Sequence, residues 1–385
     1  MKKPKSIKQC RVCGRDFFPK PLLLYKNMPK SAQYLPSVDD LSNDKGVMLE
    51  IFQCSGCGLV QLSNGPVSYF REVVRAAAFS EEMKAFRKEQ FADFIQKYSL
   101  QDKKILEVGC GRGEFLSIMK ELGLKSYGLE YSKEAVRFCN KAGLEVYQGF
   151  LDGDYDKLPQ SPFSAFFILN YLEHLPNPNS TLRDIWNNLA DDGLGIVEVP
   201  NFDMIFKKKL FFEFISDHLL YFTRDTLATT LKINGFEIIE CREVWHDYIL
   251  SAVVRKNSPL NLAPFSKNFL NLKESINSFI ESAKAKSRKV AIWGAGHQAL
   301  TIIALMNLSD RIEYVVDSAT FKQGKYTPAT HVPIVPPQKL DSDPVDSIIV
   351  MAASYSEEVV KLIRQKYETR IEIVILRDYG LEKGI

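Results

Sequence analysis

One glycine-rich segment constrains the fold of this chain more than any other feature. Residues 105–115 are ILEVGCGRGEF, which is a short apolar run, three glycines at alternate positions and the start of a helix-like stretch. Glycines directly after a buried strand let the backbone approach a ligand at the carboxyl end of that strand. The segment therefore predicts a parallel α/β unit with a nucleotide-binding loop, and a loop without a ligand is the alternative.

The spacing of the glycines indicates which nucleotide the loop binds. A dinucleotide fingerprint has the spacing G-x-G-x-x-G, whereas this loop has G-x-G-x-G with Glu107 two residues before the first glycine. That acidic start suits the positively charged amino-acid part of S-adenosylmethionine (SAM) better than a pyrophosphate. Glu130 ends the next predicted strand, where a carboxylate can accept both ribose hydroxyls. We therefore predict SAM as the cofactor.

Residues 100–200 resemble class I SAM-dependent methyltransferases. The resemblance implies that Gly149 and Phe150, after the third strand, lie near the adenine, and that Asn170, at the end of the fourth, lines the methyl side. The predicted cofactor-binding residues are Glu107, Gly109, Gly111, Gly113, Glu130, Tyr131, Gly149, Phe150 and Asn170.

Four cysteines near the start of the chain form two CxxCG pairs. They are Cys10 and Cys13 in CRVCG, and Cys54 and Cys57 in CSGCG. Two such knuckles give closed tetrahedral S₄ coordination, which is typical of structural Zn²⁺. Redox-active CxxC is less favoured because neither pair follows a strand of a βαβ unit, and four unrelated free cysteines are the remaining alternative.

The alternation of predicted elements indicates three parts. Residues 1–66 are predicted to be a zinc-ribbon-like module. A short segment rich in Pro, Lys and turn residues buries too little apolar surface to fold without a stabilising metal or cross-link. Residues 67–258 alternate strands and helices, which predicts a doubly wound, Rossmann-like SAM domain. Residues 259–385 are predicted to be a smaller Rossmann-like α/β domain. The fold class is α/β.

Three details of the SAM domain are expected from local patterns. Residues 67–98 have helical periodicity, and residues 180–193 (STLRDIWNNLADDG) are expected to be a helix ended by Gly193. Residues 235–244 and 248–256 are expected to form an antiparallel pair that closes the sheet.

The third part contains a second glycine loop. Trp293-Gly-Ala-Gly-His-Gln-Ala follows a predicted strand, and Asp317 ends the next one, which is half of a dinucleotide fingerprint. Taken alone it suggests NAD and an oxidoreductase with a degenerate first loop. Intact Glu107 and Glu130 argue against that alternative. Substrate anchoring and simple support of the fold remain open for this domain.

Composition restricts the class of partner. The chain has 385 residues and a formal net charge of +3, which gives no reason to expect nucleic-acid binding. It has neither an apolar run as long as a membrane span nor a secretory signal, so we expect a cytoplasmic protein without a membrane partner. Reducing conditions there favour a metal over disulfides at the four cysteines.

The whole chain resembles the nucleotide-sugar C-methyltransferases of deoxysugar pathways. The matching blocks are, in order, CRVCG, CSGCGLVQL, LEVGCGRGEFL, NYLEHLPNP, VEVPN and KQGKYTPATHVPIVPP. The resemblance implies a zinc module, a SAM domain and a C-terminal Rossmann-like domain acting on a nucleotide-linked keto-sugar. The implied reaction is proton abstraction beside a 4-keto group, followed by methylation of the enolate carbon.

The same resemblance implies four catalytic residues. His218 matches the base of the family's Tyr-x-Glu-His block, Asp217 stands where that block has Glu, and His174 matches the family's Asn-x-x-x-His. Tyr69 matches an active-site tyrosine after the zinc module. A histidine suits this role because its pKa lies near the operating pH. A capping or surface role for His218 and a packing role for His174 are the alternatives.

Two departures from the family pattern concern the acceptor. Ile215 replaces the tyrosine of the Tyr-x-Glu-His block, and His246-Asp-Tyr-Ile-Leu-Ser replaces a His-Gly-Gly-Ser segment. The loss of two glycines fills space near the site, so an O- or N-methyltransferase on a related sugar or polysaccharide precursor is an alternative. A zinc-dependent binding protein without enzymatic activity is the alternative from another class.

Overall fold

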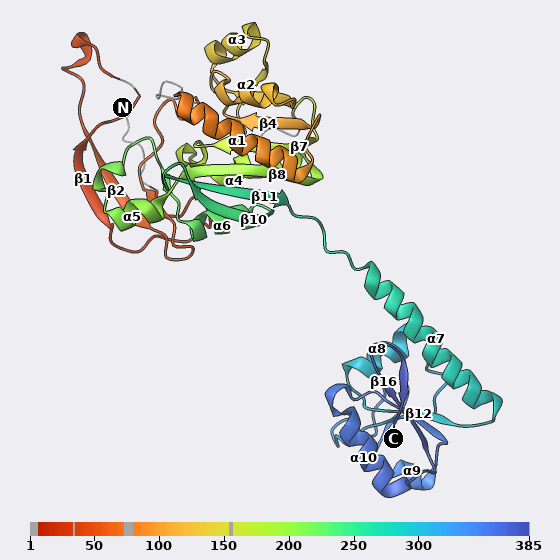
Figure 1. The fold of residues 1–385 in the computed structure, drawn as a ribbon. Helices are drawn as coiled ribbons and strands as arrows, with labels where there is room; N and C mark the ends of the chain where they lie inside the picture. The colour runs from red at the N-terminus through yellow and green to blue at the C-terminus, as the bar shows by residue number, and fades with distance from the viewer. Residues whose placement is uncertain (1–6, 34, 73–79, 154–156, 385) are drawn as a thin grey trace. The chain divides into compact units, whose positions relative to one another are not determined.

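The computed structural model describes residues 7–33, 35–72, 80–153 and 157–384. By its internal contacts the chain divides into two compact units, Met1–Ser258 and Pro259–Ile385, and each unit is described by itself below (Figure 1).

A seven-stranded mixed sheet forms the centre of the first unit. Its strands, in spatial order, are β10 (Phe236–Val244), β11 (Ile249–Lys256), β8 (Leu189–Pro200), β7 (Phe163–Leu169), β4 (Lys104–Val108), β5 (Lys125–Glu130) and β6 (Glu145–Gln148). Strands β4 to β8 run parallel, and β11 is antiparallel to both β8 and β10. The chain order reverses between β4 and β7, which is where ligands bind in open α/β sheets.

Both faces of this sheet are buried under helices. The helices are α1 (Glu81–Tyr98), α2 (Glu114–Glu121), α3 (Lys133–Lys141), α4 (Pro178–Asn188), α5 (Phe202–Lys208) and α6 (Arg224–Ile233). Phe166 and Phe167, neighbours in β7, belong to two different core clusters, because successive strand residues point to opposite faces. The near-continuous apolar run of β7 is thus that of a strand covered on both sides.

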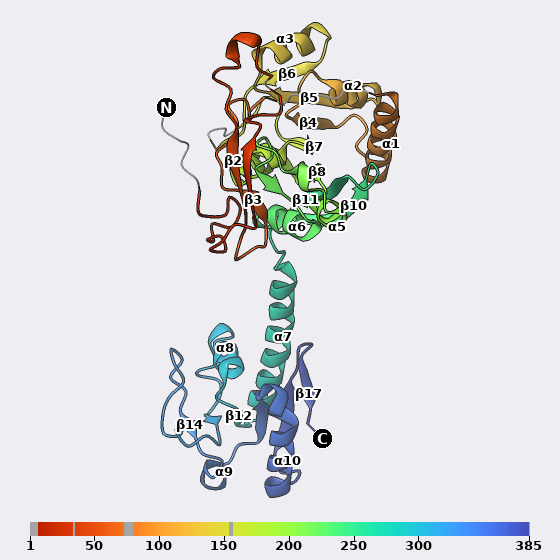
Figure 2. The same ribbon diagram turned by 90° about the vertical axis from the view of Figure 1, so that its left-hand side faces the viewer.

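A second, four-stranded sheet joins the N-terminal segment to this core. It is antiparallel, in the order β1 (Leu23–Met28), β2 (Val47–Gln53), β3 (Val60–Leu62) and β9 (Leu220–Tyr221), with a short 3-10 turn, η1 (Val38–Asp40), between β1 and β2. Figure 2 shows β2 and β3 beside the rest of the first unit. The predicted zinc module therefore shares its sheet with a strand of the predicted SAM domain.

Sequence periodicity located most helices but misplaced two boundaries. The described part of the helix expected over 67–98 begins at Glu81, since residues 69–71 form turns and residues 73–79 lie outside the described residues. The helix expected to end at Gly193 ends at Asn188, and β8 begins at Leu189, which pairs with Phe163. The poor helix formers Asn, Asp and Gly make that end susceptible to strand pairing. The antiparallel pairing of β10 with β11 is confirmed.

The second unit is a smaller α/β sandwich. Its six-stranded sheet has the order β14 (Ile334–Val335), β13 (Val315–Val316), β12 (Val290–Trp293), β15 (Ser347–Val350), β16 (Glu372–Leu376) and β17 (Leu381–Lys383), of which only the β16–β17 pairing is antiparallel. Its helices are α7 (Ala263–Ala285), α8 (His297–Leu305), α9 (Lys339–Ser342) and α10 (Ser356–Tyr367). Two core clusters cover the two faces of this sheet.

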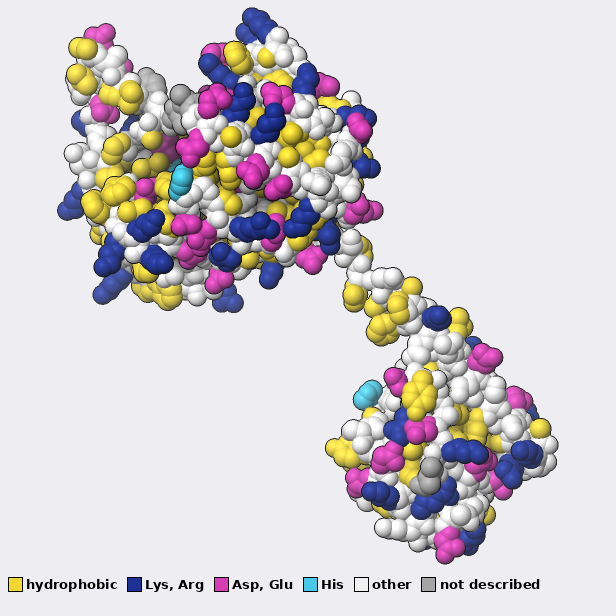
Figure 3. Space-filling view, viewed as in Figure 1, with side chains coloured by type: hydrophobic (Ala, Val, Ile, Leu, Met, Phe, Trp, Pro, Cys, Tyr) yellow, Lys and Arg dark blue, Asp and Glu magenta, His cyan; other side chains and the backbone are white. Residues whose placement is uncertain are grey.

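The surface agrees with the balanced composition. On the face drawn in Figure 3, Lys and Arg side chains alternate with Asp and Glu side chains on each unit. Among the described residues, no helix has both the length and the apolar character needed to cross a bilayer.

Candidate active site

The glycine loop follows β4 in a conformation that favours glycine. Gly109, Gly111 and Gly113 have φ values of +72°, +57° and +81°, a region that residues with a Cβ rarely adopt. A Cβ on Gly113, the N-cap of α2, would also lie 2.5 Å from Leu144 Cδ1. The backbone conformation therefore favours glycine at all three positions, and at Gly113 the neighbouring Leu144 also leaves no room for a Cβ.

The carboxylate of Glu130 is fixed beside this loop. Its side chain is buried, its Oε2 accepts the Gly111 N–H at 3.0 Å, and its Oε1 accepts the Ser132 N–H at 2.9 Å. Each carboxylate oxygen can accept a further hydrogen bond. Glu130 is therefore oriented at the end of β5 in a way that would suit ribose hydroxyls.

Five of the nine predicted cofactor residues line one small pocket. They are Gly109, Glu130, Tyr131, Gly149 and Phe150, and Arg71, Tyr171 and Thr181 also line it. The pocket lies at the carboxyl ends of β4 and β5, at the switch point of the sheet.

The other four predicted cofactor residues lie around the same sheet edge. Gly111 and Gly113 continue the loop, and Glu107 is fully buried in β4. Asn170 follows β7 with a φ of +49°, and its N–H donates to the Glu198 carbonyl at 2.9 Å. Among the described residues, its Oδ1 has no hydrogen-bond partner.

Two of the predicted catalytic residues form a short hydrogen bond. Tyr69 Oη donates to Asp217 Oδ1 at 2.5 Å. Burial, followed by this bond, raises the pKa of Tyr69. Two backbone N–H groups of the N-terminal segment complete the arrangement, since Ala32 donates to Asp217 Oδ2 at 2.7 Å and Gln33 donates to Tyr69 Oη at 3.1 Å. The N-terminal segment thus supplies part of this site.

The two predicted catalytic histidines lie against each other beside this pair. Their ring centroids are 4.7 Å apart, in an edge-to-face arrangement. His174 Nδ1 lies 2.9 Å from the carbonyl oxygen of Asp217. A carbonyl can only accept, so Nδ1 is assigned the hydrogen and Nε2 keeps its lone pair. Burial, followed by the neighbouring His174, lowers the pKa of His218 to about 3, which keeps that imidazole neutral.

Sequence patterns missed a third group in this cluster, Glu173. Its side chain is 1% exposed, its Oε1 lies 3.7 Å from His174 Nε2, and its Oε2 has no hydrogen-bond partner among the described residues. Burial raises the pKa of Glu173 to about 8, so it is mostly protonated at neutral pH. The donor atoms of Glu173, His174 and His218 lie within 4.8 Å of one another, a set that could also hold a cation. The available sequence signal for Glu173 was its position as a charged residue inside the largely apolar block NYLEHLP.

A buried ion pair beside the site was also not anticipated. Arg87 of α1 and Glu198 of β8 have fully buried side chains with Nη1 and Oε2 2.5 Å apart. Gln90 bridges them, accepting from Arg87 at 2.7 Å and donating to Glu198 Oε1 at 2.6 Å. Because the Glu198 carbonyl holds Asn170, this pair fixes α1 against the sheet edge that carries the site.

The comparisons with known families agree with this geometry. The family described as "Methyltransferase domain" matches residues 83–241, and the family described as "C-methyltransferase C-terminal domain" matches residues 255–376. The first match spans the glycine loop, Glu130 and both histidines. The protein is an enzyme of the class I SAM-dependent methyltransferase type.

Similar proteins extend this assignment to the methylated atom. The methyltransferase is 20% identical to the C-methyltransferase NovU of Streptomyces niveus over 92% of each chain. It is 30% identical to a ubiquinone biosynthesis O-methyltransferase of Chromobacterium violaceum, but over only 24% of this chain and 42% of that one. Full-length similarity to NovU, together with the C-terminal family match, supports a SAM-dependent C-methyltransferase.

Solved structures add little to the comparison. A SAM-dependent methyltransferase from Clostridium acetobutylicum aligns with a TM-score of 0.38 at 10% identity, over 44% of this methyltransferase and 91% of that chain. A TM-score of this size adds no support to the assignment.

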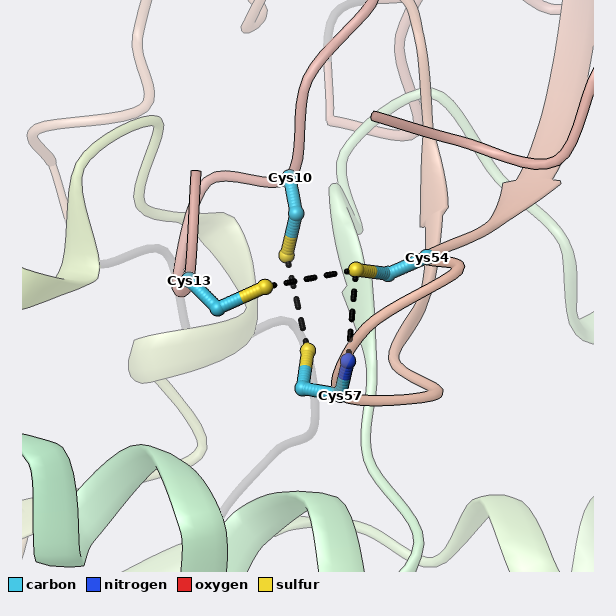
Figure 4. A group of neighbouring side chains, drawn as sticks. All are labelled: Cys10, Cys13, Cys54 and Cys57. Carbon is cyan, nitrogen blue, oxygen red and sulfur yellow. Dashed lines mark hydrogen bonds between the residues drawn. The ribbon is translucent and has the colours of Figure 1, made fainter. Parts of the chain in front are cut away.

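The four cysteines of the methyltransferase converge on one point (Figure 4). The Sγ atoms of Cys10 and Cys57 are 3.6 Å apart, those of Cys13 and Cys54 are 3.3 Å apart, and all four lie within 4.8 Å of one another. A tetrahedral zinc with Zn–S bonds of about 2.3 Å separates its sulfurs by roughly 3.8 Å, so the cluster is close to the size that Zn²⁺ requires. Gln61 Nε2 donates to Cys10 Sγ at 3.2 Å, as thiolate ligands require of their surroundings.

The second glycine loop of the methyltransferase is closed by its own residues. Asp317 Oδ2 accepts the Ala295 N–H at 2.8 Å and pairs with Lys322 at 2.9 Å, and Oδ1 accepts the Ala319 N–H at 2.8 Å. The Lys322 ammonium competes for the carboxylate that would receive ribose hydroxyls in a dinucleotide site. The NAD alternative is therefore not favoured by this geometry.

Proposed function

We propose that this methyltransferase adds a methyl group to a carbon atom next to the carbonyl of a nucleotide-linked keto-sugar. The observation that carries the proposal is the cluster of Tyr69, Asp217, His174 and His218, which lies at the same end of the sheet as the glycine loop. Carbon methylation needs a base beside the acceptor, and the cluster offers two histidines for that role.

His218 is proposed as the base. Burial lowers the pKa of His218 to about 3, so its imidazole is neutral at pH 7 and carries a lone pair that can accept a proton. An imidazole with so low a pKa is a weak base toward carbon. The negative charge that develops on the carbonyl oxygen would raise the pKa of His218 as the proton moves, so proton transfer and enolate formation support each other.

Tyr69, Asp217 and His174 are proposed to orient the acceptor. Asp217 is already held by a phenol and a backbone N–H, and His174 is held by the Asp217 carbonyl, so none of the three needs to be ordered when the acceptor binds. Bound SAM supplies an electrophilic methyl group that forms a bond to the enolate carbon as its bond to sulfur breaks.

Zn²⁺ bound by Cys10, Cys13, Cys54 and Cys57 is proposed to stabilise the N-terminal sheet. The size of the sulfur cluster and the N–H donor from Gln61 support this. The Ala32 and Gln33 contacts to the acceptor cluster come from the loop that follows β1, so the metal would act on catalysis only by holding that loop. Measuring zinc by atomic emission in wild-type protein and in Cys57→Ser tests this, and folded, active protein without zinc would contradict it.

A panel of nucleotide 4-keto-sugars incubated with SAM tests the proposed reaction. In D₂O without the methyl donor, an enolate that forms reversibly takes up deuterium at the carbon to be methylated, and we expect His218→Ala to slow both this exchange and methylation by about 10²–10⁴-fold. His246→Ala is the matched control, because His246 is exposed and pairs only with Glu82 in the described structure. A product with an O-methyl group and no carbon exchange would replace the carbon assignment with O-methylation.

A further inference from the structure

The turn that carries Tyr69 also carries a residue that enters the cofactor pocket. Residues 67–72, called the Arg71 turn here, are closed by hydrogen bonds from Phe70 N–H to Val67 O at 3.2 Å and from Glu72 N–H to Tyr69 O at 2.8 Å. Two of its side chains reach different sites. Tyr69 contacts Asp217 at the acceptor cluster, whereas Arg71 lines the pocket beside Glu130.

Three aromatic rings surround the Arg71 guanidinium. Its carbon Cζ lies 4.8 Å from the Phe70 ring centroid, 5.2 Å from that of Phe150 and 5.6 Å from that of Tyr131. The backbone is fixed as well, because the buried Tyr171 hydroxyl donates to the Arg71 carbonyl at 3.0 Å. Tyr131 and Phe150 are the aromatic residues predicted to contact SAM, and here they contact Arg71.

Little free space is left between the side chains that line the pocket in this arrangement. Its free volume is about 10 Å³, which is roughly the space of one water molecule. An adenine ring is several times larger, so the side chains that line the pocket must move when it enters. Arg71 has the longest side chain among them and is partly exposed, whereas Glu130 is held by two backbone N–H groups.

We propose that Arg71 occupies the adenosine pocket of the cofactor-free enzyme and must be displaced before SAM binds, with Tyr69 and Asp217 anchoring the turn that holds it. The inference rests on the SAM site of the proposed function but not on the identity of the acceptor. It follows that cofactor entry and the acceptor cluster are linked through one six-residue turn.

Calorimetry with SAM and with its demethylated product, S-adenosylhomocysteine, tests the displacement. We expect Arg71→Ala to bind both about 5- to 10-fold more tightly, the factor expected from no longer breaking one or two cation–π contacts. Stopped-flow binding should show the gain in the association rate constant, because removal of a competing side chain opens the pocket. A distorted pocket would bind less tightly, so loss of structure cannot produce this result.

Arg242→Ala is the matched control. Arg242 lies on β10, is exposed and pairs with Glu240 at 2.6 Å. We expect less than a twofold change in affinity for that variant. Unchanged binding by Arg71→Ala, or a change confined to the dissociation rate constant, would overturn the proposal. Weaker binding would also overturn it, and would make Arg71 an adenine contact instead.

A double-mutant cycle tests the anchor. Tyr69→Phe removes the hydroxyl that ties the turn to Asp217, so we expect it to tighten S-adenosylhomocysteine binding about two- to threefold in wild type and to have no effect in Arg71→Ala. Additive effects would refute the anchoring role. A wild-type enzyme that binds neither ligand would instead refute the proposed function, which keeps the two failures distinct.

Discussion

The two glycine loops of this enzyme have the same local design and different surroundings. Each follows a strand, begins a helix and has an acidic residue at the end of the next strand, Glu130 in the first unit and Asp317 in the second. Glu130 borders a pocket lined by aromatic side chains, whereas Asp317 is paired with Lys322. The pattern of strand, glycines and acid therefore predicts an α/β unit, and the surroundings of the acid indicate whether a ligand can bind.

The largest expected effect on SAM binding comes from a backbone change in the first glycine loop. Gly111→Val should abolish SAM binding, because a β-branched residue is strained at a φ of +57° and the Gly111 N–H that orients Glu130 would shift. Calorimetry with SAM measures this, and the milder Gly111→Ala serves if the valine variant does not fold. A folded Gly111→Val enzyme with normal SAM affinity would show that the first loop is not the cofactor site.

The second effect compares the two acidic residues. Glu130→Ala should weaken SAM binding by about 1.5–3 kcal/mol, or roughly 10- to 150-fold, because it removes charge-assisted hydrogen bonds to the ribose. Asp317→Ala should leave SAM affinity unchanged. If Asp317→Ala weakened SAM binding as much as Glu130→Ala does, the distinction between the loops would fail.

The third effect concerns stability and pH. Burial opposes ionisation of Asp317, but Lys322 and two backbone N–H groups outweigh it and lower the pKa of Asp317 below its unfolded value of 3.8. Its stabilising contribution is thus present above about pH 4 and is lost as pH falls through the folded pKa. We expect Asp317→Asn to cost about 1–2 kcal/mol at pH 7 and progressively less below pH 4, measured by urea unfolding. A pH-independent cost would contradict the ion pair.

The smallest effect on stability and on SAM binding is expected at Gly296 of the second loop, which has open space beside it. A Cβ on Gly296 would have no heavy atom within 4 Å. We expect Gly296→Ala to change stability by less than about 0.5 kcal/mol and to leave SAM binding unaltered. A large loss of acceptor affinity in that variant would indicate that this open space receives part of the substrate.

Local patterns predicted much of this enzyme. The strand and glycine turn before α2 and the closing β10–β11 pair depend on neighbours in sequence, and both are present. Patterns did not predict β9 or the end of α4, because those depend on pairing with strands far away in the chain.

The residues of the candidate site also divide into those that local sequence patterns indicate and those that depend on distant parts of the chain. The glycines, Glu130 and the two histidines follow strand ends or match family blocks. Arg71 does not, because nothing near it in sequence shows that it enters a pocket, and for Glu173 the one signal was a charged residue inside a largely apolar block. Their importance comes from long-range packing, which periodicity cannot detect.

The short strand β9 has a consequence for how this enzyme loses activity. Leu220 and Tyr221 pair with β3 of the N-terminal sheet, and they begin two residues after His218. A fluctuation that opens the N-terminal sheet must therefore release the segment that carries the proposed base, so the two should open as one cooperative unit. Amide exchange at Leu220 and at the β2–β3 ladder would then share one opening free energy, and removal of the proposed Zn²⁺ would lower both together.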